Sequence, residues 1–297
     1  MTPSNNRGAF GISGRWGGIP FWIGLLAFLH SVGLVGVMTY DPTLILNFTA
    51  VNLLFSALVV LGFGNPEGAW RWALIAYITY AVEVIGVQTG FPFGEYAYGW
   101  RLGPHFYNTP PMIGVLWLLT LMGAMYWSER CIGSEETMKA HGLRAALAAT
   151  IMVAFDIVLE PVATMANFWT WSGDHIPLKN YIAWWVIAFT LAWVWRKAVH
   201  LRTNRAAGLL LIIQTAFFIG LLVLPGNLNR FPHRSGHILH HGRGGLGCSQ
   251  IPHAWRHVVF PQGSSSTRTR IFREERCLLF DFRRAQCLVL CDGQHSQ

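Results

Sequence analysis

Seven apolar segments of about 20 residues occupy the first 225 residues of this 297-residue chain, and they restrict its fold more than any other feature. A helix of about 20 apolar residues spans the hydrocarbon core of a bilayer and satisfies its own backbone hydrogen bonds. Charged residues make up 12% of the chain, about half of the roughly 25% found in soluble domains. The sequence therefore predicts an all-α, polytopic membrane bundle of about seven transmembrane helices. The segments are Gly18–Met38, Thr43–Phe63, Trp70–Gly90, Pro111–Trp127, Gly142–Met165, Tyr181–Val199 and Ala206–Leu224.

Lys and Arg residues are divided unequally between the two sides of this predicted bundle. On one side, residues 1–17 and the alternate loops hold Arg7, Arg15, Arg71, Arg130, Lys139, Arg144, Arg196, Lys197, Arg202 and Arg205. The opposite loops hold Arg101 and Lys179. Cytoplasmic loops carry an excess of Lys and Arg, so we expect a multi-pass protein of the inner membrane with a cytoplasmic N-terminus. The first segment lacks an A-x-A-like cleavage site and is expected to be a retained helix rather than a signal peptide.

The chain changes character after Pro225, which suggests three parts: residues 1–17, the membrane domain 18–225 and a tail 226–297. The tail contains ten Arg and no Lys, and most of the His and Cys of the chain. We interpret it as a disordered or out-of-frame appendage. Nucleic-acid binding is disfavoured because the tail follows an odd number of spans and would not be cytoplasmic. A zinc site is a further alternative, although its candidate ligands lack a typical spacing: His237, His240, His241, Cys248, Cys287 and Cys291.

Three acidic residues lie inside the predicted spans. Asp156 and Glu160 are one helical turn apart and therefore share a helix face. Glu83 lies at a similar depth in an earlier span, so the three acids form one site if their helices are neighbours. A charge at the centre of a spanning helix costs roughly 2.5–3.5 kcal/mol, and such residues are usually functional. The alternative is that these acids only hydrogen-bond neighbouring helices.

Further candidates surround the predicted acidic site. Pro161, directly after Glu160, removes a backbone donor and is expected to kink the helix and make room for water or a ligand. Two polar and aromatic loops, 91–111 and 168–181, are predicted on the same side. Trp169, Trp171, Trp184 and Trp185 are interpreted as aromatics of the membrane interface, or as packing surfaces for a long apolar ligand. The substrate-binding or supporting candidates are Glu95, Tyr96, Tyr98, Arg101, His105, Trp169, Trp171, Asn180 and Tyr181. For Glu95, Arg101 and His105 an interfacial salt bridge is the alternative.

Four sequence motifs resemble those of a known family. The run TGFPFGEYAYGWRLGP, followed by FDIVLEPVA, FWTW and IPLKNYIAWW, is similar to the integral-membrane carotenoid biosynthesis proteins. That family includes the acyclic-carotenoid 1',2'-hydratases and the hydratase of bacterioruberin synthesis. The resemblance spans most of residues 20–225 and keeps the order of the motifs. Many members have Asp before the proline where this chain has Glu160.

The resemblance implies a carotenoid hydratase that adds water to the terminal 1',2' double bond of an acyclic ψ-end. Such a reaction needs a proton donor, an anion that stabilises a tertiary carbocation, and a positioned water. A carboxyl group in a desolvated site can stay protonated and donate. We expect Asp156 to be the general acid and Glu160 and Glu83 to hold water and stabilise the cation. No cofactor or metal is expected, because water addition changes no overall oxidation state.

Other functions compete with hydration. A membrane lycopene-type cyclase also protonates a ψ-end, and a proton-coupled transporter could use the same acids as a relay. A retinal photoreceptor is disfavoured because it needs a Schiff-base lysine in the last helix, whereas Lys139, Lys179 and Lys197 lie in loops or at a helix end. The expected partners are a carotenoid such as lycopene or γ-carotene, water and the bilayer, with other pathway enzymes as further candidates and no nucleic acid.

Overall fold

The computed structural model describes residues 18–64, 69–173, 175–223, 277–281 and 286–290, and helices dominate residues 18–223. Six helical segments in the described part are long and apolar enough to cross a membrane, and α2 and α3 together count as one of them. A shorter apolar helix, α7, brings the arrangement to the seven segments predicted. The all-α membrane fold is therefore confirmed. The helices are α1 (Ile19–Thr39), α2 (Pro42–Leu46), α3 (Thr49–Gly62), α4 (Ala69–Thr89), α5 (Met112–Ile132), α6 (Met138–Met165), α7 (Leu178–Val194), α8 (Val199–Arg202) and α9 (Arg205–Val223).

Four predicted segments differ from the observed helices by three or more residues. Helix α5 ends at Ile132, five residues later than predicted, and α6 begins at Met138, four residues earlier. The second segment is not one helix, because α2 ends at Leu46 and α3 begins at Thr49. The side chain of Asp41 starts α2 by accepting a hydrogen bond from the Thr43 backbone N–H at 2.8 Å, as N-cap residues do. The sixth segment starts earlier and ends earlier than predicted, because α7 follows Pro177 and stops at Val194.

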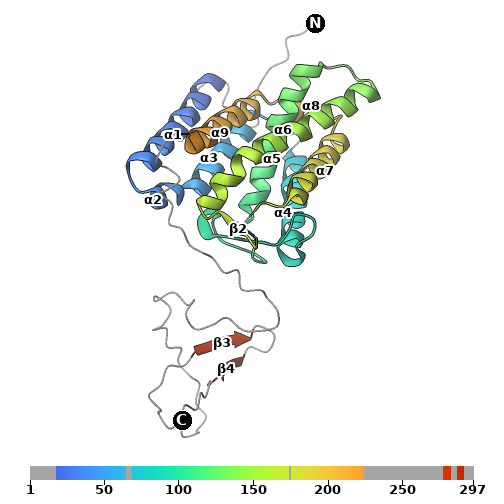
Figure 1. Cartoon of the computed structure of the whole chain (residues 1–297). Coiled ribbons are helices and arrows are strands. Elements are labelled where there is room, and N and C mark those ends of the chain that lie inside the picture. The colour runs from blue at the N-terminus through green and yellow to red at the C-terminus, as the bar shows by residue number, and fades with distance from the viewer. Residues whose placement is uncertain (1–17, 65–68, 174, 224–276, 282–285, 291–297) are drawn as a thin grey trace, which may run out of the picture. The chain divides into compact units, whose positions relative to one another are not determined.

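Helix α5 lies at the centre of the bundle and is buried along most of its length. It packs against α3, α4, α6, α8 and α9, whereas α1 packs mainly against α9 and α2. Figure 1 shows α5 between α6 and α4. Few residues of helices α1 and α4 are fully buried, as expected of helices that face lipid. The centre of the fold is therefore α5, and it can reach side chains of α4 and α6 alike.

A short antiparallel ribbon forms at one end of this bundle, which we call the ribbon end. Strand β1 (Tyr96–Tyr98) precedes the 3-10 helix η2 (Trp100–Leu102) and pairs with β2 (Trp169–Trp171). The register places Tyr96 opposite Trp171 and Tyr98 opposite Trp169. The ribbon thus joins the loop after α4 to the loop after α6, two segments that the sequence analysis treated as separate loops.

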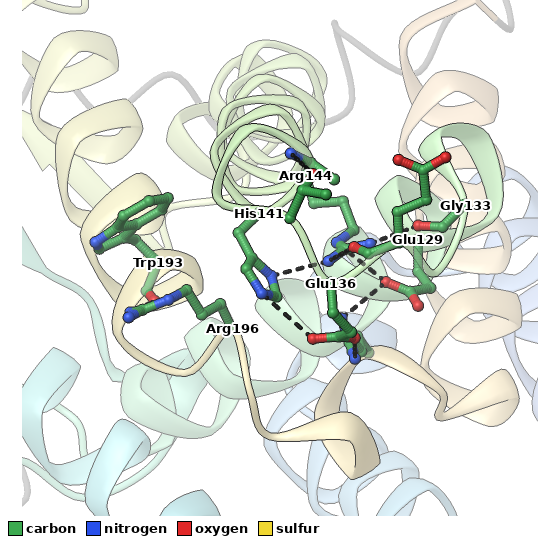
Figure 2. A network of polar contacts seen from close by, with 11 residues as sticks. Glu129, Gly133, Glu136, His141, Arg144, Trp193 and Arg196 are labelled. Carbon is green, nitrogen blue, oxygen red and sulfur yellow. Dashed lines mark hydrogen bonds and ion pairs between the residues drawn. The ribbon is translucent and has the colours of Figure 1, made fainter.

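Buried ion pairs hold the opposite end together, which we call the arginine end (Figure 2). Arg144 and Arg202 both pair with Glu129, at 3.3 and 3.4 Å. Arg202 also donates to Glu136, and this hydrogen bond lowers the pKa of the Glu136 carboxyl. His141 lies 3.3 Å from Glu136. Two of the arginines counted toward the cytoplasmic side are therefore also structural, because they tie α5, α6 and α8 to one another.

The tail contributes a second unit of structure, residues 239–297. Within it, β3 (Cys277–Asp281) pairs with β4 (Gln286–Leu290) in an antiparallel hairpin that the sequence analysis did not predict. Of the zinc-ligand candidates, Cys287 lies in β4, and the others lie outside the described residues. Residues 1–17 and most of 226–297 also lie outside them. The interpretation of the tail as disordered or out-of-frame stays a prediction.

Candidate active site

The three predicted acids lie buried near the ribbon end of the bundle. The exposed fractions of Glu83, Asp156 and Glu160 are 3%, 0% and 2%. Glu83 comes from α4, and the other two come from α6. Helix α5 packs against both of these helices, so the acids are brought together around α5. Among the described residues, no Lys, Arg or His side chain forms an ion pair with any of them.

Glu83 accepts three hydrogen bonds. Its Oε2 accepts from the hydroxyls of Tyr96 at 2.5 Å and Tyr98 at 2.7 Å. Its Oε1 accepts from the indole N–H of Trp117, on α5, at 2.8 Å. Burial and the nearby Glu83 charge raise the pKa of Tyr96 and of Tyr98 above the ordinary value of 10. Both hydroxyls therefore stay protonated and remain donors to Glu83.

Glu160 also accepts three hydrogen bonds, and Asp156 accepts one. The indole N–H groups of Trp169 and Trp171 both donate to Glu160 Oε2 at 3.0 Å. The side-chain amide of Asn180, on α7, donates to Glu160 Oε1 at 3.2 Å and to Asp156 Oδ2 at 3.0 Å. Asp156 Oδ1 is buried without a partner in the described part of the chain. One amide group thus links the two acids of α6, and Asp156 is the least solvated acid of the site.

The alternation of side chains along the ribbon explains how four of these donors reach the acids. Successive residues of a strand point to opposite faces. Tyr96 and Tyr98 of β1 and Trp169 and Trp171 of β2 therefore share one face, which is the face toward the acids. Tyr96 packs on Trp171 with ring centroids 5.1 Å apart. The two tyrosines bind the acid of α4 while the two tryptophans bind an acid of α6, so the ribbon joins the two halves of the site.

The ribbon can approach α4 closely because residue 86 is glycine. A Cβ atom there would lie 2.6 Å from the Phe93 ring and 2.9 Å from the Tyr96 hydroxyl. Cβ atoms in proteins essentially never lie this close to neighbouring atoms. Gly86 lies three residues after Glu83, on the same part of the helix surface. The missing side chain therefore makes the space in which Tyr96 reaches Glu83.

A small cavity of about 20 Å³ lies between Glu83 and Glu160. A volume of about 10–15 Å³ on this measure is enough for one water molecule if polar partners are present. The two carboxyl groups and Asn180 supply such partners, and the aromatic rings complete the wall. The remaining lining residues are Phe93, Tyr96, Tyr98, Ile113, Trp169, Trp171 and Trp184.

Helix α6 continues past Pro161 to Met165, so the proline does not end the helix beside Glu160. The helix instead ends with Asn167 in the left-handed conformation, at φ 60°. The backbone N–H groups of Asn167 and Phe168 donate to Thr164 and Ala163, as in a Schellman motif. This ending turns the chain directly into β2. The expected opening beside the acids therefore comes from the ribbon and its neighbours.

Four of the predicted supporting residues make no hydrogen bond to the acids within the described part of the chain. Glu95 is exposed. Arg101 donates instead to the Thr43 carbonyl at 3.1 Å and to Asn47 Oδ1 at 3.2 Å, so it holds the η2 segment against the α2–α3 junction. His105 packs on Trp100 at 4.4 Å, and Tyr181 makes no hydrogen bond to the acids among the described residues. The alternative of a salt bridge among Glu95, Arg101 and His105 is not observed within the described residues either.

The interpretation of the tryptophans as interfacial aromatics is wrong for Trp169, Trp171 and Trp184, which are 6%, 9% and 4% exposed. The first two are buried because their N–H groups bind Glu160. Trp117, which stacks on Trp184 with centroids 4.0 Å apart and binds Glu83, was not predicted at all. Its place near the start of α5 resembles that of an interfacial tryptophan, so no local signal distinguished it.

Fold and site together define a class: an integral-membrane helical protein whose buried carboxyl groups are held by aromatic and amide donors. In the described residues no three His, Cys, Asp or Glu side chains gather as metal ligands would. Residues 38–234, more than half of the chain, match the profile of the carotenoid biosynthesis protein family. The chain therefore belongs to that family, as the motifs predicted.

The chain is also similar to one characterised type of protein in its sequence. Over 116 residues, the chain is 31% identical to bisanhydrobacterioruberin hydratase from Haloarcula japonica. The match covers 38% of this chain and 39% of the relative. The chain thus spans about two fifths of the length of this relative. No solved structure matches the chain.

Proposed function

We propose that the protein is a cofactor-independent carotenoid hydratase that adds water to the terminal 1',2' double bond of an acyclic ψ-end. The observation that supports this most is the unequal hydrogen bonding of the three buried acids. Glu83 and Glu160 each accept from three donors, whereas Asp156 accepts from one. Hydrogen-bond donors stabilise an ionised carboxyl group. Asp156 is therefore the acid best suited to stay protonated and to give its proton to a hydrocarbon.

The reaction balances without an oxidant or reductant. The Asp156 proton adds to the less substituted carbon of the double bond and leaves a tertiary carbocation. The oxygen of a water molecule bonds to that carbon and releases a proton to a carboxylate, and transfer of this proton restores Asp156. In this proposal Glu83 and Glu160 hold the water between them and stabilise the cation by their charge. The small cavity that both line supports this division of roles.

The test is the replacement Asp156→Asn, which keeps the shape of the side chain but removes its acidic proton. Loss of a general acid lowers a rate by about 100-fold or more, so a lycopene- or γ-carotene-producing host should lose the hydrated pigment. Extraction and mass spectrometry measure the product, and the amount of folded protein in the membrane is the control. Full hydration by Asp156→Asn would refute the assignment.

The same experiment with the unaltered chain separates hydration from the two alternatives. A hydrated product carries the mass of one added water molecule. A cyclase yields a product of the same mass as its substrate, because an internal double bond captures the cation instead of water. A transporter leaves the pigment chemically unchanged. Appearance of a cyclised pigment, or of no new pigment, would therefore contradict the proposed hydratase.

A further inference from the structure

A second and larger cavity, of about 280 Å³, lies between α1, α2, α3, α5, α6 and α9. Its lining is mostly aliphatic and aromatic. Ligand sites for small molecules usually measure about 300–1,000 Å³ and are predominantly apolar. The cavity is therefore large enough for the end of a long isoprenoid but not for an entire carotenoid.

The lining includes residues on the outer surface of the bundle. Leu29 and Val32 on α1 and Phe48 at the α2–α3 junction are 37%, 50% and 61% exposed. Helix α1 is apolar enough to span a membrane, and only Leu26, His30 and Val37 of it are buried. Exposed residues of such a helix contact lipid, so the cavity opens sideways into the bilayer. A molecule dissolved in the membrane can enter it without passing through water.

The inner wall of this cavity is shared with the acidic site. Leu159 and Ala163 line it and flank Glu160 on α6. Trp169 lines both this cavity and the small cavity beside the carboxyl groups. Its indole N–H binds Glu160 at 3.0 Å, and Trp171 donates to the same oxygen. The Trp169 side chain thus borders both cavities, and its displacement would leave Glu160 with two of its three donors.

Polar side chains in the lining, among them His30, Asn52 and Gln214, argue against an ordinary lipid acyl chain as the occupant. His30 Nδ1 lies 2.8 Å from the Leu26 carbonyl, and its Nε2 lies 3.3 Å from the Asn52 amide nitrogen. Asn52 Oδ1 is buried without a partner in the described part of the chain. Gln214 is 7% exposed and makes no hydrogen bond there. An unpaired buried polar atom is costly, and a ligand that gains a hydroxyl group could donate a hydrogen bond to Asn52 Oδ1.

We propose that this cavity admits the acyclic end of the carotenoid from the bilayer and brings it to the acids at Trp169. In this assignment, which rests on the proposed hydration, the hydroxyl of the product binds the polar group formed by His30, Asn52 and Gln214. The rest of the polyene extends into the membrane past Leu29, Val32 and Phe48.

The test measures pigment binding and does not depend on catalysis. The full chain with Asp156→Asn is expressed in a lycopene-producing host and purified in detergent, and the bound carotenoid is measured by absorbance per protein. Adding Val32→Trp plugs the cavity mouth and should lower bound lycopene by about tenfold. Adding Val35→Trp is the matched control, because Val35 is a 56% exposed valine of the same helix outside the lining. It should leave binding unchanged.

The binding measurements test the role of the cavity independently of the proposed reaction. Equal pigment in the Val32→Trp and Val35→Trp proteins, or no pigment in the Asp156→Asn parent, would overturn the proposal. Failure of the unaltered protein to hydrate lycopene would refute the reaction and not the binding result.

Gln214→Leu should weaken binding of the hydroxylated carotenoid by about fivefold more than that of lycopene. An equal effect on both pigments would overturn the role of the polar group.

Discussion

Asn180 is the residue on which the geometry of the α6 acids depends most. Its amide nitrogen donates to both Asp156 and Glu160, and it is 2% exposed. Asp156 has no other partner among the described residues. The two hydrogens of one amide group therefore fix the distance between the proposed proton donor and its neighbour. Asn180 acts through the acids and is a positioning residue.

We predict that Asn180→Leu lowers hydration by about tenfold to a hundredfold, because a hydrogen bond to a charged group contributes about 1.5–3 kcal/mol. The pH dependence of the rate should also shift, since the substitution removes a donor from each acid. Rates are measured in membranes across pH 5–9. Lys179→Leu is the control, because Lys179 is an exposed neighbour on the same helix. An unchanged pH profile would contradict the positioning role.

The β1–β2 ribbon is the element that assembles the site. It is three residues long on each strand, yet four of the seven hydrogen bonds that the acids accept come from its side chains. A two-stranded ribbon this short has little stability of its own. Its side chains bind the acids, and the Gly99 backbone N–H donates to the Phe168 carbonyl at 2.8 Å. The missing side chain of Gly86 leaves room for the ribbon to pack on α4.

Gly86→Ala is therefore expected to displace Phe93 and Tyr96 and to lower hydration by about tenfold, the effect of losing one hydrogen bond to a charged group. In an ordinary helix the same change is favourable, because Ala has the higher helix propensity. Gly24→Ala is the matched control, since a Cβ at Gly24 meets nothing within 4 Å. Product formation and thermal unfolding are measured together. Activity of Gly86→Ala equal to that of Gly24→Ala would show that the close approach is unnecessary.

For the whole molecule, the two ends of the bundle differ in kind. The ribbon end holds buried acids and aromatic donors, and the arginine end holds the ion-pair network of Figure 2. Excess Lys and Arg face the cytoplasm in membrane proteins. We therefore infer that the arginine end is cytoplasmic in the inner membrane, with the proposed reaction near the opposite surface.

Cys131, exposed at the arginine end of α5, allows this orientation to be measured. With the four tail cysteines replaced by Ser, a membrane-impermeant maleimide should label Cys131 only after the membrane is opened. Ser172→Cys, at the exposed ribbon end, is the control and should be labelled in intact spheroplasts. The reverse pattern would show the opposite orientation.

Some features of this protein follow from the sequence alone. The length and apolarity of the segments determine the helical membrane fold, because each span must satisfy its backbone hydrogen bonds within itself. The acids could be identified in the same way, since Glu83, Asp156 and Glu160 are anomalous in apolar segments. The motifs around them identified the family. These signals are local in the chain, which is why no structure was needed to detect them.

The tertiary structure alone decided what surrounds the acids. Trp117 lies 34 residues from Glu83, and the ribbon pairs Tyr98 with a residue of another loop, so spacing could not predict either contact. Tryptophan is common at the membrane interface, but Trp169 and Trp171 are buried donors because the ribbon turns their N–H groups toward Glu160. The cavity that opens to the bilayer likewise depends on six helices at once. Hydrogen bonding and burial are properties of neighbours in space, and the packing around α5 determines which residues those are.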